Sequence, residues 1–199
     1  LPNDVSPQEV RDCLHEELAQ ALGPLNDLYR LPDSVFNDDN VHTVLTGFDM
    51  LMLRTYYSPK LHNGMTRGQV VATLPHILRE INPRGEAVRA SFSTRTPIQW
   101  KRAIETALGP SSKNSSRRSA AAEALRIAEA MGWQDQRRAF AHYAMGHVLQ
   151  HENPRDAHQH YLAAKRFYVA TSGTALHQAY VATQLAAYSI TQGKGQEAL

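Results

Sequence analysis

The sequence predicts a mainly α-helical protein, and three observations carry that prediction. Patterns in which Thr is followed three residues later by Asp or Gln occur at 46–49, 66–69 and 96–99, and such capping boxes mark helix starts. Apolar residues recur three and four positions apart in long segments, which is the period of an amphipathic helix. Only residues 88–92 have the composition of a short strand, and we expect them to form an extended loop.

The first helix is expected over residues 7–22. Ser6 suits the N-cap, Pro7 the first helical position and Glu9 the third. The residues expected to form its apolar face are Val10, Leu14, Leu18, Ala21 and Leu22. The Gly-Pro pair at 23–24 then ends the helix.

The remaining helices follow from the same signals. We expect them over residues 46–57, 67–80, 97–108, 116–131, 135–150, 155–171 and 175–192. The stretch 109–116 is rich in Gly, Pro and Ser and has the composition of a linker. We therefore divide the chain into residues 1–65, a helical connector over 66–115 and a helical module over 116–199.

One segment of the first helix bears most directly on function. Its glycine, Gly23, can be aligned with the glycine of the pattern H-E-x-x-H-x-x-G-x-x-H. This alignment places Glu16, Gln20 and Asn26 at the three histidine positions, and Glu17 falls on the glutamate. In proteases with this pattern the histidines bind zinc and the glutamate is the general base. The segment therefore resembles a metzincin zinc-binding helix whose metal ligands have been replaced.

Later landmarks extend this resemblance. The Ser-Val-Phe sequence at 34–36 stands where such proteases carry a Ser-(Ile/Val)-Met turn beneath the metal. Residues 45–49 and 53–59 are similar to the closing helix of a matrix-metalloprotease-like domain, which reads L-T-x-x-D and ends L-Y-G-P. The resemblance implies that residues 1–65 are the helical C-terminal half of a degenerate metzincin-like domain, with its upstream half missing or in another chain. An ordinary amphipathic helix is the alternative for the first landmark.

The replaced positions predict that this helix holds no zinc and that the protein has no cofactor. Zinc prefers imidazole, thiolate or carboxylate ligands, and the amides of Gln20 and Asn26 are poor ones. Oxygen donors from Glu16, Gln20 and Asp27 would suit a harder cation better than zinc. Without a metal-activated water, Glu17 has no nucleophile to prepare. We expect Glu17 to be structural and to accept hydrogen bonds from the Ser-Val-Phe loop.

The C-terminal part resembles a tetratricopeptide-like module of helical hairpins. Its helices alternate small and large residues: Ala139, Tyr143 and Gly146, then Ala157, Tyr161 and Ala164, then Ala179, Tyr180, Leu185 and Ala186. Small residues let antiparallel helices approach closely while large ones fill the grooves. A plain helical bundle is the alternative. In stacked hairpins the first helix of each pair lines a concave face, and we expect partner binding there at Arg137, Arg138, His142 and Gln178.

Across its whole length the chain also resembles an uncharacterised bacterial family. The shared motifs lie at residues 13–23, 34–38, 45–49, 64–65, 82–85 and 100–105. The resemblance implies that replacement of the ligand histidines is common to the family rather than a change in this chain alone. It favours a repurposed, non-catalytic scaffold and supplies no activity.

Charge is unevenly distributed along the chain. Residues 1–60 hold ten Asp/Glu and four Lys/Arg, and residues 61–199 hold nine and seventeen, so the two parts carry net charges of −6 and +8. This difference suggests that an acidic surface meets a basic one, within the chain or by self-association of copies. The basic pairs at 117–118 and 137–138 lack interleaved aromatic residues, so we expect no nucleic-acid partner.

Cysteine, histidine and tryptophan have mainly structural interpretations. Cys13 is the only cysteine, so no intrachain disulfide can form, and we expect a small buried side chain. His147 and His151 lie one helical turn apart; this spacing can chelate a metal, but we expect exposed polar surface. Trp100 and Trp133 are expected to pack between helices.

Together these observations predict a protein-interaction or scaffold subunit of a bacterial assembly that does not act as an enzyme. We expect an exported or envelope-associated, periplasmic assembly, with the cytoplasm as the alternative. No apolar run has membrane-spanning length, and no signal peptide is visible at residues 1–4. Two other functions stay open. One is a metal-dependent peptidase with Glu17 as general base, and the other is a peptide-binding domain with an acidic groove near Glu16, Glu17 and Asp27.

Overall fold

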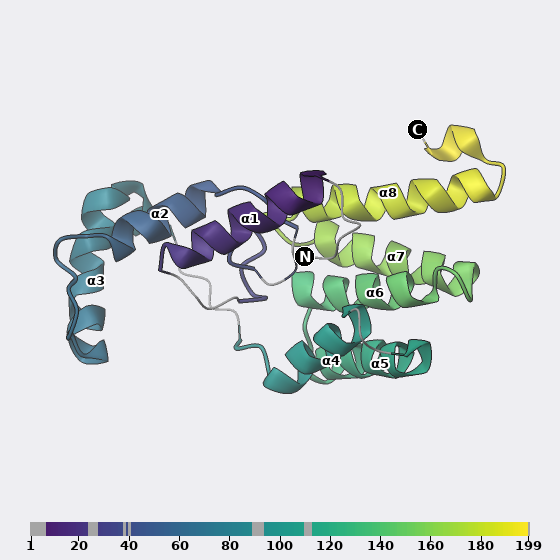
Figure 1. The fold of residues 1–199 in the computed structure, drawn as a ribbon, viewed down its shortest axis with the longest axis horizontal. Coiled ribbons are helices and arrows are strands. Elements are labelled where there is room, and N and C mark those ends of the chain that lie inside the picture. The colour runs from purple at the N-terminus through teal and green to yellow at the C-terminus, as the bar shows by residue number, and fades with distance from the viewer. Residues whose placement is uncertain are drawn as a thin grey trace. The chain divides into compact units, whose positions relative to one another are not determined.

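The structure, a computed structural model, describes residues 7–23, 28–37, 39, 41–88, 94–109 and 113–198. Its elements are α1 (Pro7–Ala21), α2 (Gly47–Tyr56), α3 (Arg67–Ile81), the 3-10 helix η1 (Pro83–Ala87), α4 (Ile98–Leu108), α5 (Asn114–Ala130), α6 (Gln136–Leu149), α7 (Pro154–Val169), α8 (Ala175–Thr191) and the 3-10 helix η2 (Gly195–Ala198), as Figure 1 shows. These residues contain helices and no strands, so the mainly α-helical prediction is confirmed. None of the described helices combines the length and apolar character needed to span a bilayer.

Each predicted helix has a counterpart whose ends differ by two residues at most, because the cap chemistry sets the ends. The Thr46 hydroxyl accepts from the Asp49 amide at 3.3 Å, and the Asp49 carboxylate accepts from the Thr46 amide at 2.8 Å. Thr66 makes the same reciprocal pair with a glutamine at the start of α3. The third predicted box does not form, since Pro97 is the N-cap of α4. The Thr96 hydroxyl instead accepts a hydrogen bond from Arg137.

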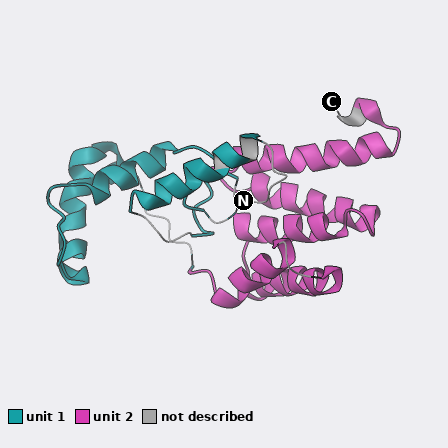
Figure 2. Ribbon diagram, viewed as in Figure 1, with its two compact units in different colours: residues 1–94 teal, residues 95–199 magenta. Residues whose placement is uncertain are grey.

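Two compact units make up the chain (Figure 2): unit 1 is Leu1–Thr94 and unit 2 is Arg95–Leu199. The division falls inside the predicted connector 66–115, which is therefore not a body of its own. In unit 1, α3 packs on α2, and in unit 2, α4 packs on α5 and α6. The linker composition of 109–116 does not mark a boundary, because the helices on its two sides pack together.

Unit 1 has a small core between α1, the loop that precedes α2, and α2. It consists of Ala19, Val35, Phe36 and Leu53, each 8% exposed or less. The predicted apolar face of α1 lies outside this core: Leu14 is 57% and Leu18 62% exposed, and Ala21 and Leu22 are exposed as well. α1 thus turns the small Ala19 inward and leaves its larger apolar side chains outside. Cys13 is half-buried.

Unit 2 is a stack in which each of α4 to α8 packs on the next, and α4 also packs on α6. Figure 1 shows α6, α7 and α8 side by side. The buried core of the stack includes Ala107, Ala121, Ala139, Met145, Leu149, Ala157, Tyr161, Ala164, Tyr168 and Val181. The core is rich in alanine, so the helices can approach one another closely.

The closest approach joins α6 to α7. A side-chain carbon at Gly146 would lie 2.8 Å from the ring of Tyr161, nearer than carbon atoms pack, so α6 needs a glycine at this position. Small residues opposite aromatic ones are the packing that the sequence predicts for this part of the chain. The resemblance to tetratricopeptide hairpins itself stays a prediction.

Candidate functional site

The Ser-Val-Phe loop and the start of α2 are joined by one buried carboxylate, that of Asp49, which is 0% exposed. It accepts hydrogen bonds from the Ser34 hydroxyl at 2.6 Å, the Val35 amide at 3.0 Å and the Thr46 amide at 2.8 Å. The Ser34 oxygen in turn accepts from the Phe36 amide at 3.0 Å. Two landmarks that the sequence analysis singled out separately therefore form one hydrogen-bonded structure, which we call the Asp49 hub.

The C-terminal end of α1 is fastened to the end of α2. The Tyr57 hydroxyl donates to the Leu22 carbonyl oxygen at 2.7 Å. Gly23 has φ +133°, and a side-chain carbon there would meet the Tyr56 ring at 2.4 Å. Both the backbone angle and the close approach require glycine. The glycine of the protease-like pattern thus has a structural function here.

The predicted metal-ligand positions do not form a described site. Glu16 and Gln20 are half-buried on α1, and Asn26 lies outside the described residues, as does Asp27. No group of three or more His, Cys, Asp or Glu side chains that could share a metal occurs in the described part of the chain.

Glu17 lies on α1 and is exposed. We expected it to accept hydrogen bonds from the loop at 33–38, of which position 38 is outside the described residues. In the described part of this loop, the donors of Ser34 and Val35 are bound by Asp49 instead. A buried carboxylate on α2 therefore has the fastening role that we assigned to Glu17, because α1 turns Ala19 rather than Glu17 toward the loop.

In unit 2, Arg137 does not lie on an accessible surface. Its side chain is 1% exposed and forms an ion pair with Asp135 at 2.6 Å. Its guanidinium also donates to Thr96 at 3.2 Å and lies 3.9 Å above the ring of Trp133. Trp133 packs edge to face on Trp100, with ring centroids 5.6 Å apart. Arg137 thus binds the start of α4 to the start of α6, and we no longer expect a partner to contact it.

Arg138 and His142 lie in a cluster of basic and aromatic side chains on α6 and α7. The Arg138 guanidinium lies 4.8 Å from the Phe167 ring centroid, and the His142 ring stacks on Phe167 at 5.7 Å. The Nδ1 atoms of His142 and His160 are 3.1 Å apart, a distance at which one ring can donate to the other. With Arg166, which is exposed, these residues form what we call the α6–α7 basic surface.

The pKa of His142 reflects the electrostatics of this surface. Burial, the neighbouring His160 and the guanidinium groups of Arg138 and Arg166 lower the pKa of His142 to about 4. Burial also lowers the pKa of His160. The imidazoles are therefore neutral at pH 7, and the positive charge resides on the two arginines. The Glu129 carboxylate lies 3.6 Å from the Arg138 guanidinium, and the Glu129 side chain is 75% exposed.

Gln178 and the pair His147 and His151 have mainly local contacts. The Gln178 amide donates to the Tyr168 carbonyl oxygen at 3.5 Å and to the Thr174 hydroxyl at 3.2 Å, which ties α8 to the end of α7. His147 is half-buried and His151 exposed. Burial, Arg117 and His151 lower the pKa of His147.

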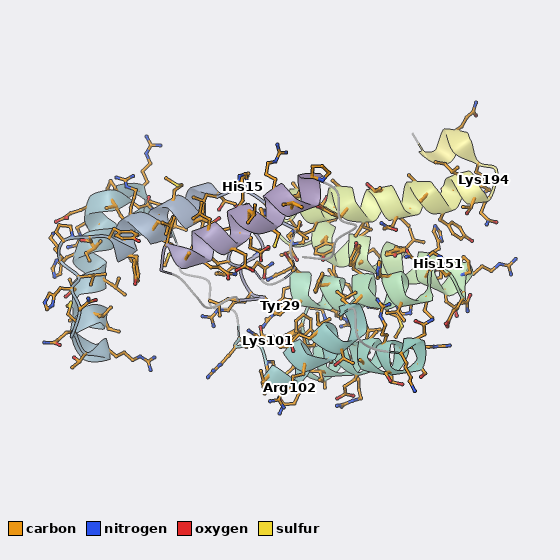
Figure 3. The ribbon with its side chains drawn as sticks, viewed as in Figure 1. His15, Tyr29, Lys101, Arg102, His151 and Lys194 are labelled. Carbon is orange, nitrogen blue, oxygen red and sulfur yellow. The ribbon has the colours of Figure 1, made fainter. Side chains whose placement is uncertain are left out.

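A groove opens at the end of unit 2 where α6 ends, α7 begins and α8 ends; Figure 3 labels His151 and Lys194 at this end of the stack. Its volume is about 420 Å³. The described lining residues are Gln150, His151, Pro154, Ala157, His158, Tyr161, Gln184, Ala187, Tyr188, Thr191 and Gln192. The His158 ring stacks on Tyr188 at 4.2 Å, and the Tyr161 hydroxyl donates to Gln150 at 3.2 Å.

Comparison with known proteins bears on unit 1. Residues 1–76 match the model of a protein family described as "Protein of unknown function (DUF2927)". The match spans α1, the Asp49 hub, α2 and most of α3, and it confirms for this region the resemblance to an uncharacterised domain family. No curated protein and no solved structure matches the chain. The resemblances to metzincins and to tetratricopeptide hairpins rest on the sequence patterns alone.

Part of the basic surface could be predicted from the sequence, whereas the groove was not predicted. Arg138 and His142 on α6 were expected to bind a partner, but their neighbours on α7 were not. Spacing could have found one pair, because His160 and Phe167 lie seven residues apart and so share a helix face. The groove has a comparable signal in the polar residues four apart at positions 184, 188 and 192, on α8 and at its C-cap.

Proposed function

We propose that this chain is a non-catalytic protein-interaction or scaffold subunit. The observation that carries the proposal is the α6–α7 basic surface, in which Arg138 lies over the half-buried ring of Phe167 and Arg166 lies near His142. Arg and aromatic residues are enriched in protein–protein contacts. Placement in an exported or envelope-associated bacterial assembly rests on the sequence resemblances alone.

The partner that fits this surface carries an acidic segment. Unit 2 holds thirteen Lys/Arg and seven Asp/Glu, a net charge of +6, whereas unit 1 holds eight and twelve, a net charge of −4. Opposite charges favour encounter and orientation of two surfaces. Unit 1 of a second copy is therefore one acidic partner that the chain itself offers.

The surface of unit 1 also supports an interaction function. Leu14 and Leu18 are more than half exposed, one helical turn apart on α1, and Tyr56 on α2 is 53% exposed. Neighbouring exposed apolar side chains, such as Leu14 and Leu18, are typical of surfaces that another protein covers. This support is independent of the charge on unit 2.

A charge-reversal experiment on the whole chain tests the proposal. The probe is a fluorescent peptide of alternating Asp, Glu and Leu with a central Phe, and its Ser-substituted analogue measures uncharged binding. The test variant is Arg138→Glu with Arg166→Glu. The matched control is Arg118→Glu with Arg155→Glu, which changes net charge equally at two exposed arginines outside the surface.

We expect the test variant to weaken binding about tenfold more than the control, which is about 1.4 kcal/mol. Binding should also weaken with salt, since the Debye length falls from about 10 Å at 0.1 M to about 3 Å at 1 M. Equal losses in the two variants would show that net charge alone attracts the peptide and would contradict the proposal.

A further inference from the structure

The groove at the end of α6, α7 and α8 differs in chemistry from the rest of unit 2. None of its described lining residues is an Asp, Glu, Lys or Arg, although unit 2 as a whole carries a net charge of +6. An ionised ligand group moved into such a site loses hydration and meets no opposite charge, which is costly. The groove therefore selects against charged ligands, including the acidic segment proposed for the basic surface.

Hydrogen-bonding groups line one side of the groove at regular spacing. Gln184, Tyr188 and Gln192 follow one another at intervals of four residues. Four residues of an α-helix rise about 6 Å, and two residues of an extended chain span about 6.6 Å. Over the length of the groove, the spacing of these side chains therefore matches the spacing of every second residue in an extended peptide.

Two side-chain amides line the groove, that of Gln184 on α8 and that of Gln192 directly after α8. Among the described residues, the amide groups of Gln184 and Gln192 have no protein partner. Each carries two N–H donors and one carbonyl acceptor, so one amide can match both the C=O and the N–H of a peptide backbone. A backbone is an uncharged ligand with this alternation of donors and acceptors.

The groove also contains aromatic rings and small residues. His158 and Tyr188 are stacked at 4.2 Å, and Tyr161, 3% exposed, is held by Gln150. Ala157 and Ala187 are the smallest residues of the lining. The volume of about 420 Å³ lies in the range of about 300–1,000 Å³ that is usual for ligand sites. Apolar side chains such as Leu or Pro fit this environment.

We propose that the groove is a second binding site, which takes an uncharged peptide segment in extended conformation with an apolar side chain against the stacked rings of His158 and Tyr188. The site is independent of the α6–α7 basic surface, so either can fail without the other. The two sites also differ in their response to salt, because contacts between uncharged groups are not screened.

Selection from a random heptapeptide phage library on the immobilised full chain tests this proposal. Selection is done at about 1 M NaCl, where the Debye length is about 3 Å and binding through the basic surface is suppressed. We expect the enriched peptides to lack Asp, Glu, Lys and Arg and to carry a central apolar residue. Acidic enriched sequences, or no enrichment over an uncoated surface, would overturn the proposal.

An enriched peptide is then measured against variants of α8. Gln184→Ala with Tyr188→Ala should weaken its binding about tenfold or more, since truncated anchor residues typically cost that much. Thr183→Ala, on the exposed side of the same helix, should bind as the wild type does. Gln192→Lys places a charge at an exposed position of the groove and tests the site even if the double variant fails to fold.

Unchanged binding in both groove variants would show that the peptide binds elsewhere and would overturn the assignment. The other uncharged ligand class with alternating donors and acceptors is an oligosaccharide. If no peptide is enriched, and cellotetraose binds to the wild type but not to Gln192→Lys, the groove is a carbohydrate site. This result would equally overturn the proposal.

Discussion

Removing the Asp49 carboxylate should destabilise unit 1 by several times the roughly 1 kcal/mol of an ordinary hydrogen bond. In Asp49→Ala the Ser34 hydroxyl and the Val35 amide lose their acceptor, and these residues are 0% and 2% exposed. A buried donor without a partner costs about 1–3 kcal/mol, so the pair costs about 2–6 kcal/mol. The Thr46 amide belongs to a half-buried residue and can bind water instead. Loss of its hydrogen bond to Asp49 should therefore cost only about 1 kcal/mol.

Hydrogen–deuterium exchange of the full chain can localise this loss, because the two units are separate bodies. A loss of about 3 kcal/mol corresponds to about a hundredfold faster exchange, at about 1.4 kcal/mol per factor of ten. We expect this acceleration in peptides that cover residues 28–56, with peptides from α5 to α7 unchanged. Asp49→Asn keeps one acceptor oxygen and should give an intermediate result if the alanine variant does not fold.

Asp33→Ala is the matched control on the same loop. The Asp33 side chain is 62% exposed and lies 3.4 Å from His42, and exposed ion pairs contribute about 1 kcal/mol or less. If Asp49→Ala accelerates exchange no more than Asp33→Ala does, the buried hydrogen bonds are not what holds the loop, and the reasoning is refuted.

Four further predictions follow from individual residues. Because the pKa of His142 is lowered in the folded protein, the unfolded chain takes up the proton first as the pH falls. The free energy of unfolding of unit 2 should therefore be highest above about pH 6.5 and should decrease as the pH falls toward about 4. In urea unfolding, His142→Gln should show a flatter pH dependence than the wild type. Gly146→Ala should cost about 1–3 kcal/mol through overlap with Tyr161, and Tyr161→Leu in the same chain should recover part of that loss in thermal unfolding. Elemental analysis should find no stoichiometric zinc, whereas near-equimolar zinc that is lost on Glu16→Ala would revive the metallopeptidase alternative. Glu17→Gln should change stability by less than about 0.5 kcal/mol, since the side chain is exposed, and peptide hydrolysis abolished by this change would contradict a non-catalytic role.

The helix positions could be predicted because their determinants are local. Thr46, Thr66 and Asn153 form side-chain caps within three residues of themselves, so the signal lies in a short stretch of sequence. Thr96 shows the limit of this reasoning. Its capping pattern is present, but Arg137, forty-one residues away, binds the hydroxyl. A partner at that distance along the chain cannot be read from a local pattern.

The candidate sites could be predicted only in part, because they depend on which face of each helix is turned inward. Periodicity identifies the stripe of Leu14 and Leu18 but not whether a neighbour covers it, and here none of the described residues does so. Arg137 and Arg138 are adjacent and chemically identical, yet only Arg138 belongs to the basic surface. The groove arises from three helices that meet at one end, which no single segment encodes.

The family match ends inside a helix, and this affects where the matched region can be cut from the rest of the chain. The matched residues stop at 76, whereas α3 runs from Arg67 to Ile81 and η1 packs back on it. A helix cut at residue 76 would lose its last turn and the cap at Asn82, which donates to the Leu78 carbonyl oxygen. In this chain, residues beyond the match complete α3. A fragment meant to fold by itself should extend to residue 94, where unit 1 ends.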